Sequence, residues 1–354
     1  MKKSVIISII IPCLNEKRTI LRAIKRARLA GKLSKLTFEV IVSDSGSTDG
    51  TIAVLNKQKL AKFVNAPIKG YGAALHWGIL NSKGVYVFFA DADLSYDFLQ
   101  LKKFLKYIDL EYDLILGTRL KGKIQKGSMP LLNRYLGTPA LTLLIRLMYG
   151  LNVTDCNSGM RLIKRSFYSK LHMRNSGMEW ASELLLKTAL WQGKYIETPI
   201  SFYKDRRSRK SHLVPWSDGW RHLKAIVLVK PLYLLFPIIL LGLLSILTVK
   251  YFFTVSFFFF LLAVTLFLSM LAAMMLNYVI DDKETWLIKR LKKFPLVYYS
   301  VVSTICVFAF LFLFPEERIG TKIILISLTM IYNIWVFFIE TIRTHLINSL
   351  PETK

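Results

Sequence analysis

The sequence predicts an α/β domain built on a mostly parallel sheet, followed by an all-α region of four transmembrane helices. From residue 1 to about 228, short apolar runs alternate with charged, glycine-bearing stretches of helical period. This alternation is typical of parallel strands that are covered by helices on both faces. From about 229 to 354, long apolar stretches dominate, and charges are confined to short connections. We therefore expect a domain over 1–228 and a transmembrane domain over 229–354.

The first 120 residues contain four apolar, strand-like runs, which read VIISIIIP, FEVIVSD, AKFVNA and VYVFFA. A helix is expected after the first run, capped by Asn15 and stopped at Gly31. The carboxyl ends of parallel strands meet at one edge of a sheet, where open α/β sheets bind their ligands. The polar residues that directly follow each strand are therefore the candidate site.

The composition favours a membrane partner over a nucleic acid. Lys and Arg number 49 against 23 Asp and Glu, which gives a formal net charge of +26. Basic side chains beside anionic headgroups contribute roughly 1 kcal/mol each to attachment, and no RNA- or DNA-binding motif is present. We expect membrane lipids, and no nucleic acid, as partners. Cys13, Cys156 and Cys306 are too scattered for a disulfide framework or a zinc site.

The second half of the chain contains four apolar segments, at 232–249, 255–277, 296–314 and 323–342. Each is about long enough to cross a hydrocarbon core of ~30 Å as a helix. The connection between the second and third segments is strongly basic, whereas the next one has only Arg318 and Lys322. The positive-inside rule then predicts a multi-pass protein of the plasma or inner membrane, with the first domain and both termini in the cytoplasm.

Two further segments, near 129–150 and 217–230, are apolar and helical in tendency. A core helix is one interpretation of the first. Arg134 and Arg146 within its apolar surface favour a helix that lies in the membrane interface, where long cationic side chains reach the headgroups.

The run Ala90 to Ser95, ADADLS, gives the sharpest chemical signal. Asp91 and Asp93 follow a strand and are separated by one residue, so both carboxylates can approach a hard divalent cation. Such a metal would bridge a diphosphate and neutralise its charge. The alternative is that Asp93 or Ser95 caps a helix that begins near Tyr96.

The other strand ends carry nucleotide-binding candidates. Asp44 can accept a hydrogen bond from a base or a ribose, and Gly70 lets the backbone approach a nucleotide. Asn15 and Asp49 have an equally good interpretation as helix caps. The GYG of KGYGAAL is only a weak match to a dinucleotide fingerprint, because the third glycine is missing.

The ordered set IIPCLNE, VSDSGSTDGT, KGYGAAL, DADLS, GTR and SGMRLI resembles glycosyltransferase family 2, and within it the dolichyl- or polyprenyl-phosphate sugar synthases. The resemblance covers roughly residues 4–222. It implies a GT-A fold, which is Rossmann-like, an inverting mechanism, Mg²⁺ or Mn²⁺ at the paired aspartates, and an isoprenoid phosphate acceptor.

The resemblance also assigns residues. It places Asp91 and Asp93 at the metal and makes Asp93, Arg119 and Arg134 the catalytic group. It places Pro12, Glu16 and Asp44 around the nucleotide, and together with Asn15, Gly70 and Asp91 these are the positions expected to bind the nucleotide-sugar. The positions assigned to the lipid phosphate are Arg119, Arg134, Thr138 and Arg206.

Each lipid-phosphate assignment has an alternative. Arg134 and Thr138 are four residues apart, so on one helix both could meet one phosphate. Arg134 could instead extend towards headgroups. Arg206 begins a loop similar to the family's R-x-x-G-x-S segment, but Arg209 stands where glycine is common. Its cations could therefore form a solvated, lipid-facing patch.

Three acids, Asp155, Glu179 and Glu183, are candidates for orienting groups. A sugar hydroxyl needs a general base, whereas a lipid phosphate is already anionic near pH 7 and needs none. Positioning and electrostatics then suffice, and these acids could also be simple helix charges.

The sequence therefore predicts transfer of a single sugar from a nucleotide-sugar, with UDP-glucose favoured, to polyprenyl or dolichyl phosphate at the cytoplasmic membrane face. A processive polysaccharide synthase is the nearest alternative, but its Q-x-x-R-W motif is absent. A non-catalytic sugar-nucleotide-binding membrane scaffold would be expected to lack the carboxylate pair, which is intact. A homo-oligomer is compatible with the sequence.

Overall fold

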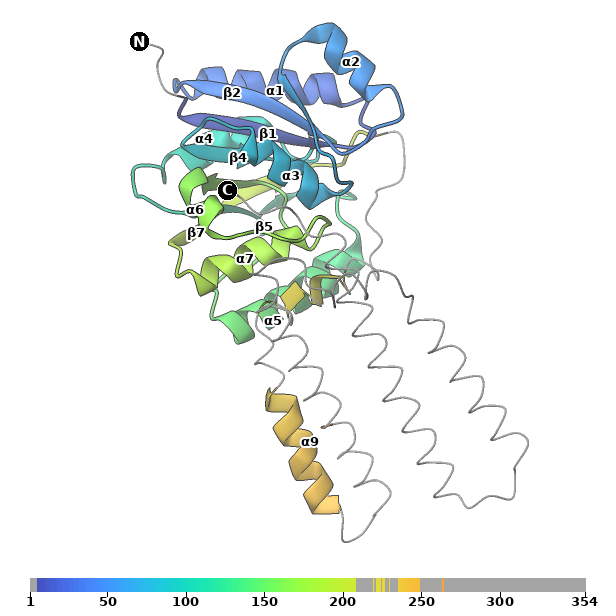
Figure 1. Ribbon diagram of the computed structural model, residues 1–354, viewed down its shortest axis with the longest axis vertical. Coiled ribbons are helices and arrows are strands. Elements are labelled where there is room, and N and C mark those ends of the chain that lie inside the picture. The colour runs from blue at the N-terminus through green and yellow to red at the C-terminus, as the bar shows by residue number, and fades with distance from the viewer. Residues whose placement is uncertain are drawn as a thin grey trace, which may run out of the picture. The chain divides into compact units, whose positions relative to one another are not determined.

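The computed structural model describes residues 5–207, 219, 221–223, 225–226, 229, 235–248 and 263. The chain divides into two units (Figure 1), of which the first holds the described residues through Ile226 and the second begins at Val227. The first unit carries the sheet and all of the candidate site residues. The second unit contains α9 (Leu235–Thr248).

The first unit is built on a seven-stranded sheet in the order β3-β2-β1-β4-β6-β5-β7. Strands β1 to β4 are parallel, β6 is antiparallel to both β4 and β5, and β7 is parallel to β5. The predicted mostly parallel α/β sheet is confirmed, and β6 makes it mixed. The strands are β1 (Ile7–Cys13), β2 (Phe38–Asp44), β3 (Lys62–Asn65), β4 (Tyr86–Phe89), β5 (Leu114–Ile124), β6 (Arg161–Lys164) and β7 (Tyr195–Phe202).

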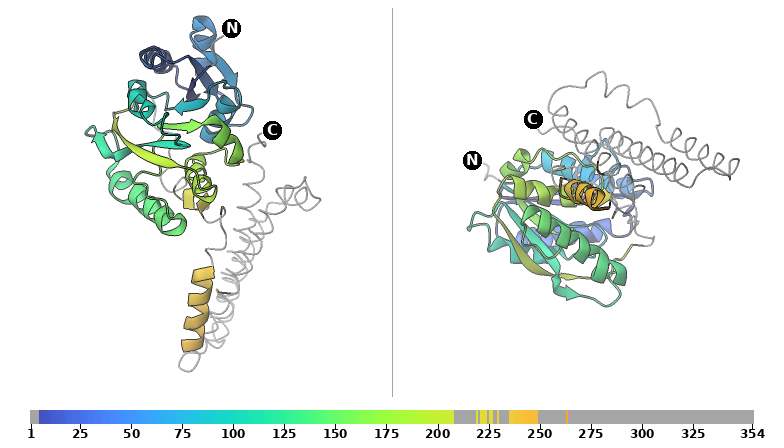
Figure 2. Two further views of the ribbon diagram at one scale, coloured as in Figure 1. Left: turned by 90° about the vertical axis from the view of Figure 1, so that its left-hand side faces the viewer. Right: turned by 90° about the horizontal axis from the view of Figure 1, so that it is seen from below.

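Helices cover both faces of this sheet. Helices α1 and α4 pack on one face, and α3 and α7 pack on the other, with α5 beside α7 (Figure 2). The helices of the first unit are α1 (Ile20–Leu33), α2 (Thr51–Gln58), α3 (Tyr71–Leu80), α4 (Leu101–Leu105), α5 (Thr138–Tyr149), α6 (Arg165–Lys170) and α7 (Trp180–Leu190). Two short turns complete them, the 3-10 turn η1 (Phe98–Gln100) and the π-helical turn η2 (Asn133–Gly137).

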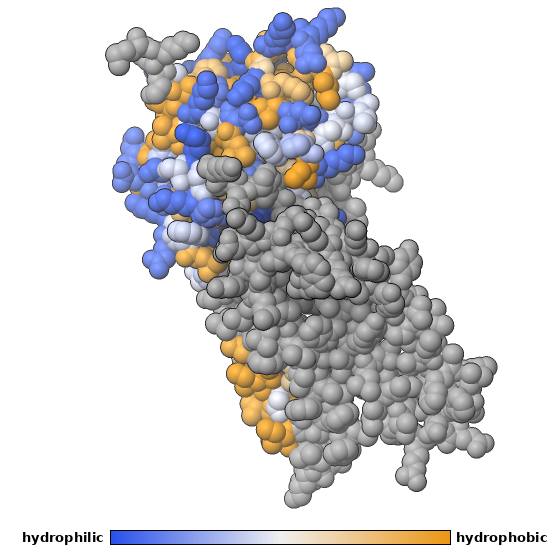
Figure 3. All heavy atoms as spheres, viewed as in Figure 1, coloured by the Kyte–Doolittle hydropathy of each residue, from blue (hydrophilic) through white to orange (hydrophobic). Residues whose placement is uncertain are grey.

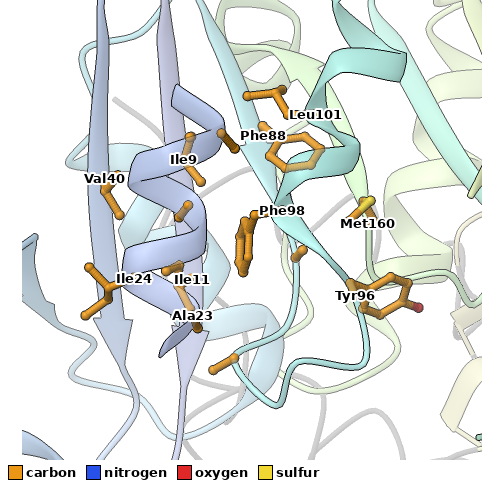
Figure 4. Close-up of a cluster of buried hydrophobic side chains, with 14 of the residues drawn as sticks. Ile9, Ile11, Ala23, Ile24, Val40, Phe88, Tyr96, Phe98, Leu101 and Met160 are labelled. Carbon is orange, nitrogen blue, oxygen red and sulfur yellow. The ribbon is translucent and has the colours of Figure 1, made fainter. Parts of the chain in front are cut away.

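The core between α1 and the sheet explains the continuous apolar run of β1. Ile9 and Ile11 point from β1 towards Ile24 of α1, and Phe88 of β4 meets Phe98 (Figure 4). All seven residues of β1 are buried, because each face of the strand packs against a helical layer. A strand buried on both faces has no polar alternation.

The predicted limits of the first helix were wrong. Helix α1 begins at Ile20 with Thr19 as its N-cap residue, and it continues through Gly31 to Leu33. Asn15 lies outside the helix with a φ of 57°, because its side chain binds a neighbouring loop. Gly31 serves packing instead of ending the helix, since a Cβ there would lie 2.3 Å from the Phe38 ring.

The predicted helical segment near 129–150 is formed by η2 and α5. Thr138, Thr142 and Ile145 are buried, whereas the opposite side of the segment is apolar and exposed. The exposed apolar face consists of Leu131, Leu132, Tyr135, Leu136, Leu143 and Leu147. The segment thus exposes apolar side chains to solvent and buries two threonines and an isoleucine.

The described residues of the 217–230 segment through Ile226 belong to the first unit. His222 is buried, and its Nδ1 lies 2.7 Å from Ser182 Oγ of α7. The Tyr149 hydroxyl of α5 donates to the Ile226 carbonyl over 2.6 Å. This segment is thus held against α5 and α7.

Most of the predicted membrane region lies outside the described residues. Helix α9 falls within the segment predicted at 232–249 and reads LFPIILLGLLSILT, without a charged residue. Figure 3 shows apolar side chains along its visible face, and Phe236 and Leu247 are among those exposed. Of the other three predicted segments, only Ala263 is described, within 255–277. Within the described part of the chain, no helix is both long and apolar enough to span a membrane.

We predict that His222 makes the stability of the protein depend on pH. Burial, and then the charge of Arg161, lowers the pKa of His222 to about 4. In the unfolded chain the histidine pKa is near 6.5, so between pH 6.5 and 4 the unfolded protein binds a proton that the folded protein does not. The free energy of unfolding therefore falls over this pH range, by up to about 3 kcal/mol. His222→Gln should flatten this dependence in thermal unfolding measured from pH 7.5 to 4. His172→Asn, at an exposed histidine, is the control and should leave this dependence unchanged. An equal change of stability with pH in the unchanged protein and both variants would contradict the prediction.

Candidate active site

The candidate site lies at the carboxyl edge of β1, β2 and β4. Cys13 at the end of β1 pairs in register with Asp44 at the end of β2, and Ile10 pairs with Phe89 of β4. The loops that follow these strands therefore emerge side by side. Glu16 and Asp93, from two of these loops, both approach Arg207, which follows β7.

Asp91 is held by α3 and by a glycine. The Tyr71 hydroxyl, at the first residue of α3, donates to Asp91 Oδ1 over 3.0 Å. Gly159 leaves room for this carboxylate, since a Cβ there would lie 2.8 Å from Asp91 Oδ2. Burial raises the pKa of Asp91, although the Tyr71 hydrogen bond opposes this. A nearby cation would favour its charged form.

Asp93 is organised differently. Its Oδ1 accepts from Ser95 N over 2.8 Å and from Ser95 Oγ over 2.6 Å. Its Oδ2 forms an ion pair with Arg207 Nη2. The next helical turn starts at Phe98, and Asp97 caps it. The interpretation of Asp93 or Ser95 as a helix cap is therefore wrong.

The carboxylate pair fits a divalent cation that shares its coordination with phosphate oxygens. No group of three or more His, Cys, Asp or Glu side chains that could hold a metal exists in the described part of the chain. Mg²⁺ is commonly bound through one or two carboxylates together with substrate phosphates. Asp93 already contacts a cation, the Arg207 guanidinium. Asp91 and Asp93 are thus the residues that would hold the metal.

Two residues predicted to bind the nucleotide organise loops in this structure. Asp44 is fully buried, and its Oδ2 accepts from Gly46 N over 2.9 Å and Ser47 N over 2.8 Å. Asn15 Oδ1 accepts from Thr48 N over 2.7 Å, which joins the β1 and β2 loops. These bonds shape the edge of the sheet on which the site is built.

Pro12, Glu16 and Gly70 also have local structural roles. Pro12 is buried in β1 opposite Ser43. Glu16 Oε2 accepts from Thr19 Oγ1 over 2.8 Å at the start of α1. Gly70 has a φ of 142°, and a Cβ there would lie 2.2 Å from the Ser176 carbonyl. The close approach of the 175–177 loop therefore requires this glycine.

Arg119 and Asp155 form a buried, bidentate pair. Arg119 Nε lies 2.7 Å from Asp155 Oδ2, and Nη2 lies 2.8 Å from Oδ1. Burial alone would lower the pKa of Arg119, but Asp155 raises it above the usual value. The guanidinium also lies over the Phe202 ring, 5.2 Å from its centroid. Asp155 therefore fixes the orientation of the Arg119 guanidinium and balances its buried charge.

Arg119 lies in β5, Arg134 in η2, Thr138 at the first residue of α5, and Arg206 after β7. Arg134 precedes Thr138 by about one turn of η2, a π-helical turn in which Thr138 N bonds to Asn133 O. That the two side chains meet one phosphate stays a prediction. Arg134 is half-buried and Thr138 is buried. Arg206 lines a cavity of about 570 Å³. The other cations that line this cavity are Arg22, Arg26 and Lys204.

Glu179 and Glu183 differ in their surroundings. Glu183 is buried and accepts from Arg174 N over 2.9 Å and Asn175 N over 2.8 Å, and it pairs with Lys187. Its role is to hold the 174–175 loop. Burial raises the pKa of Glu179, whose Oε2 has no hydrogen-bond partner among the described residues. Glu179 is therefore the better candidate for an orienting acid.

Sequence reasoning missed Tyr71 and Arg207. Tyr71 stands inside the KGYGAAL motif, and its place directly after Gly70, at the same sheet edge as Asp91, was the available signal. Arg207 is one of several adjacent cations, so the sequence offered no means of choosing it over Arg206. Only the path of the chain after β7 distinguishes them.

Comparison with known proteins gives the family. Residues 8–171 match the family described as Glycosyl transferase family 2. A dolichyl-phosphate hexose transferase of Haloferax volcanii is 32% identical over 194 residues, which cover 54% of this chain and 80% of that protein. This chain belongs to glycosyltransferase family 2. The resemblance seen in the sequence is thus confirmed.

Two further similarities extend this comparison. The low-salt glycan biosynthesis hexosyltransferase Agl6 of Haloferax volcanii is 34% identical over 229 residues, covering 64% of this chain and 54% of Agl6. The chain thus spans about half the length of that relative. A solved mycobacterial protein superposes with a TM-score of 0.50 at 20% identity, covering 63% of this chain and 74% of that protein. At that identity the likeness concerns the fold alone.

We predict that Arg119 and Asp155 stabilise the protein only as a pair. Asp155→Ala should lower the free energy of unfolding by about 3–5 kcal/mol, because it leaves a buried guanidinium unpaired, whereas the double variant Arg119→Met, Asp155→Leu should recover most of that loss. Lys121→Met, which breaks the more exposed pair with Glu197, should change stability by less than about 1 kcal/mol. Urea unfolding followed by tryptophan fluorescence measures all three. A loss as small as the control's in Asp155→Ala would contradict the pairing argument.

Proposed function

We propose that this chain transfers one sugar from a nucleotide-sugar to a polyprenyl or dolichyl phosphate at the cytoplasmic face of a membrane. The observation that carries the proposal is the pair Asp91 and Asp93 at the carboxyl edge of a family 2 fold, with Tyr71 on one carboxylate and Arg207 on the other. The 32% identity to a dolichyl-phosphate hexose transferase supports the acceptor class. UDP-glucose is the donor that we favour.

In the proposed reaction, an oxygen of the acceptor phosphate attacks the anomeric carbon of the sugar. The new carbon–oxygen bond forms as the bond to the donor diphosphate breaks, and the nucleoside diphosphate leaves with the bonding electron pair. The configuration at the anomeric carbon is inverted. No proton has to be removed, since the attacking phosphate is anionic near pH 7, and so no general base is needed.

The protein's part is to position charge. A bound Mg²⁺ or Mn²⁺ at Asp91 and Asp93 would neutralise the departing diphosphate. Tyr71 fixes the orientation of Asp91, and Ser95 fixes that of Asp93, so neither carboxylate has to reorganise. Arg119, kept charged and rigid by Asp155, supplies a cation next to this edge.

The apolar face of η2 and α5 supports attachment to lipid. Leu131 and Leu147 are 72% and 75% exposed. Exposed apolar side chains beside Arg134 and Arg146 suit a helix in the membrane interface, with cations at the level of the headgroups. We propose that this face meets the bilayer and that the region beyond Val227 anchors the protein through four transmembrane helices. A lipid acceptor would then reach Arg134 directly.

The function is tested with the purified full chain, a panel of nucleotide-sugars, Mg²⁺ or Mn²⁺, and undecaprenyl or dolichyl phosphate. We predict a product that carries one added sugar, and a rate at least about 100-fold lower in Asp93→Asn, because an amide binds a hard cation poorly. Circular dichroism controls for folding of the variant. Near-normal turnover in Asp93→Asn would contradict the site. A ladder of added sugars would support the processive synthase, and nucleotide binding without turnover would support the scaffold.

We predict that Arg134→Lys raises the polyprenyl-phosphate concentration needed for half-maximal rate by about tenfold, because an ammonium cannot reproduce the planar, bidentate fork of a guanidinium. The corresponding value for the donor should not change. Arg146→Lys is the matched control, since it makes the same substitution at an exposed position of α5. An unchanged acceptor dependence in Arg134→Lys would remove Arg134 from the acceptor site and leave it a headgroup contact.

A further inference from the structure

Arg207 is surrounded by carboxylates at the candidate metal site. Its Nη2 pairs with Asp93 Oδ2, and its Nε lies 3.9 Å from Glu16 Oε1 and 3.7 Å from Asp205 Oδ2. The side chain is 13% exposed, so these charges interact with little screening. A cation of the protein itself therefore neutralises the carboxylate cluster.

The contacts of Arg207 are only partly satisfied. Its Nε is buried and has no hydrogen-bond partner among the described residues, because both of its carboxylate neighbours are too distant. A buried donor without a partner is unfavourable, because it has lost its hydrogen bond to water and gained none in the protein. The guanidinium is thus paired in charge at this place but does not make all of its hydrogen bonds. A cation that binds the Asp93 carboxylate more strongly can therefore displace it.

The backbone keeps Arg207 beside Asp93 whatever its side chain does. Tyr203 N donates to Ser95 O over 2.9 Å, and Arg206 N donates to Asp93 O over 3.0 Å. These two bonds lay the segment 203–206 along residues 93–95. Because it is tethered there, the Arg207 guanidinium has a high effective concentration for binding to the Asp93 carboxylate.

We propose that Arg207 is a positioning residue that competes with the divalent metal for Asp93. Asp93 Oδ2 cannot hold the guanidinium and a metal ion at ligand distance together, because the two cations repel each other and share one oxygen. Binding of the metal must displace the guanidinium. The displaced side chain remains tethered beside the metal site, close to Glu16 and Asp205, and, resting on the proposed function, the donor diphosphate is a further anion at this place. Arg207 thereby couples occupation of the metal site to the position of its own guanidinium.

The test measures Mn²⁺ affinity with neither donor nor acceptor present. Mn²⁺ is titrated into the full chain, and free Mn²⁺ is followed by its electron paramagnetic resonance signal. Arg207→Gln should tighten Mn²⁺ binding by about tenfold, since it removes the competing charge. Arg207→Lys, which keeps a cation in reach of Asp93, should bind Mn²⁺ within about threefold of the unchanged protein, and Asp93→Asn should lose the site.

The matched control is Lys204→Gln, which removes a unit of positive charge from the same segment at a residue that lines the cavity with Arg206. It should change Mn²⁺ affinity by less than about twofold. Unchanged affinity in Arg207→Gln, or equal tightening in Lys204→Gln, would overturn the competition. If sugar transfer is present but Arg207→Gln leaves Mn²⁺ affinity unchanged, the inference alone fails. If Arg207→Gln tightens binding but no donor is turned over, only the proposed function fails.

Discussion

The burial of β1 on both faces is the constraint on which the rest of the first unit depends. β1 is the central strand of the parallel set, paired with β2 on one side and β4 on the other. Apolar side chains from α1 pack on one face of the strand and α3 lies against the other, so neither strand register nor helix placement can shift without exposing apolar surface. The loops that carry Glu16, Asp44 and Asp91 are therefore fixed relative to one another before any of their polar contacts form.

Two fully or nearly fully buried arginines, Arg119 and Arg161, are the second feature of this edge, and each is satisfied in its own way. Arg119 is paired with Asp155. Arg161 is fully buried and instead donates to three backbone carbonyls, those of Cys156, Ser158 and Ala181, over 2.7–2.9 Å. These bonds shape the loop that leads to Gly159 and so to Asp91. The SGMRLI motif is thus explained by the support that it gives to the carboxylate site.

The sequence predicted strands β1 to β4, because a strand buried in an α/β sheet leaves an apolar run between helical segments. It predicted helix ends poorly. Gly31 is a strong stop signal in isolation, yet the Phe38 ring needs that glycine inside α1. Asn15 is a favoured cap, yet its oxygen binds the 48–49 loop. In both cases a contact distant in sequence decided the local structure.

By itself, the sequence determined the α/β class, the family, and the carboxylates at the end of β4, because periodicity and ordered motifs are properties of the chain alone. The tertiary structure alone decided which polar side chain meets which. Asp155 pairs with Arg119, and Glu183 accepts hydrogen bonds from the 174–175 loop. The side chain that pairs with the Asp93 carboxylate is that of Arg207 and not that of Arg206. The physical reason is that a carboxylate pairs with the cation that folding brings within about 4 Å of it, and residues as far apart as Asp93 and Arg207 carry no mark of that proximity in the sequence.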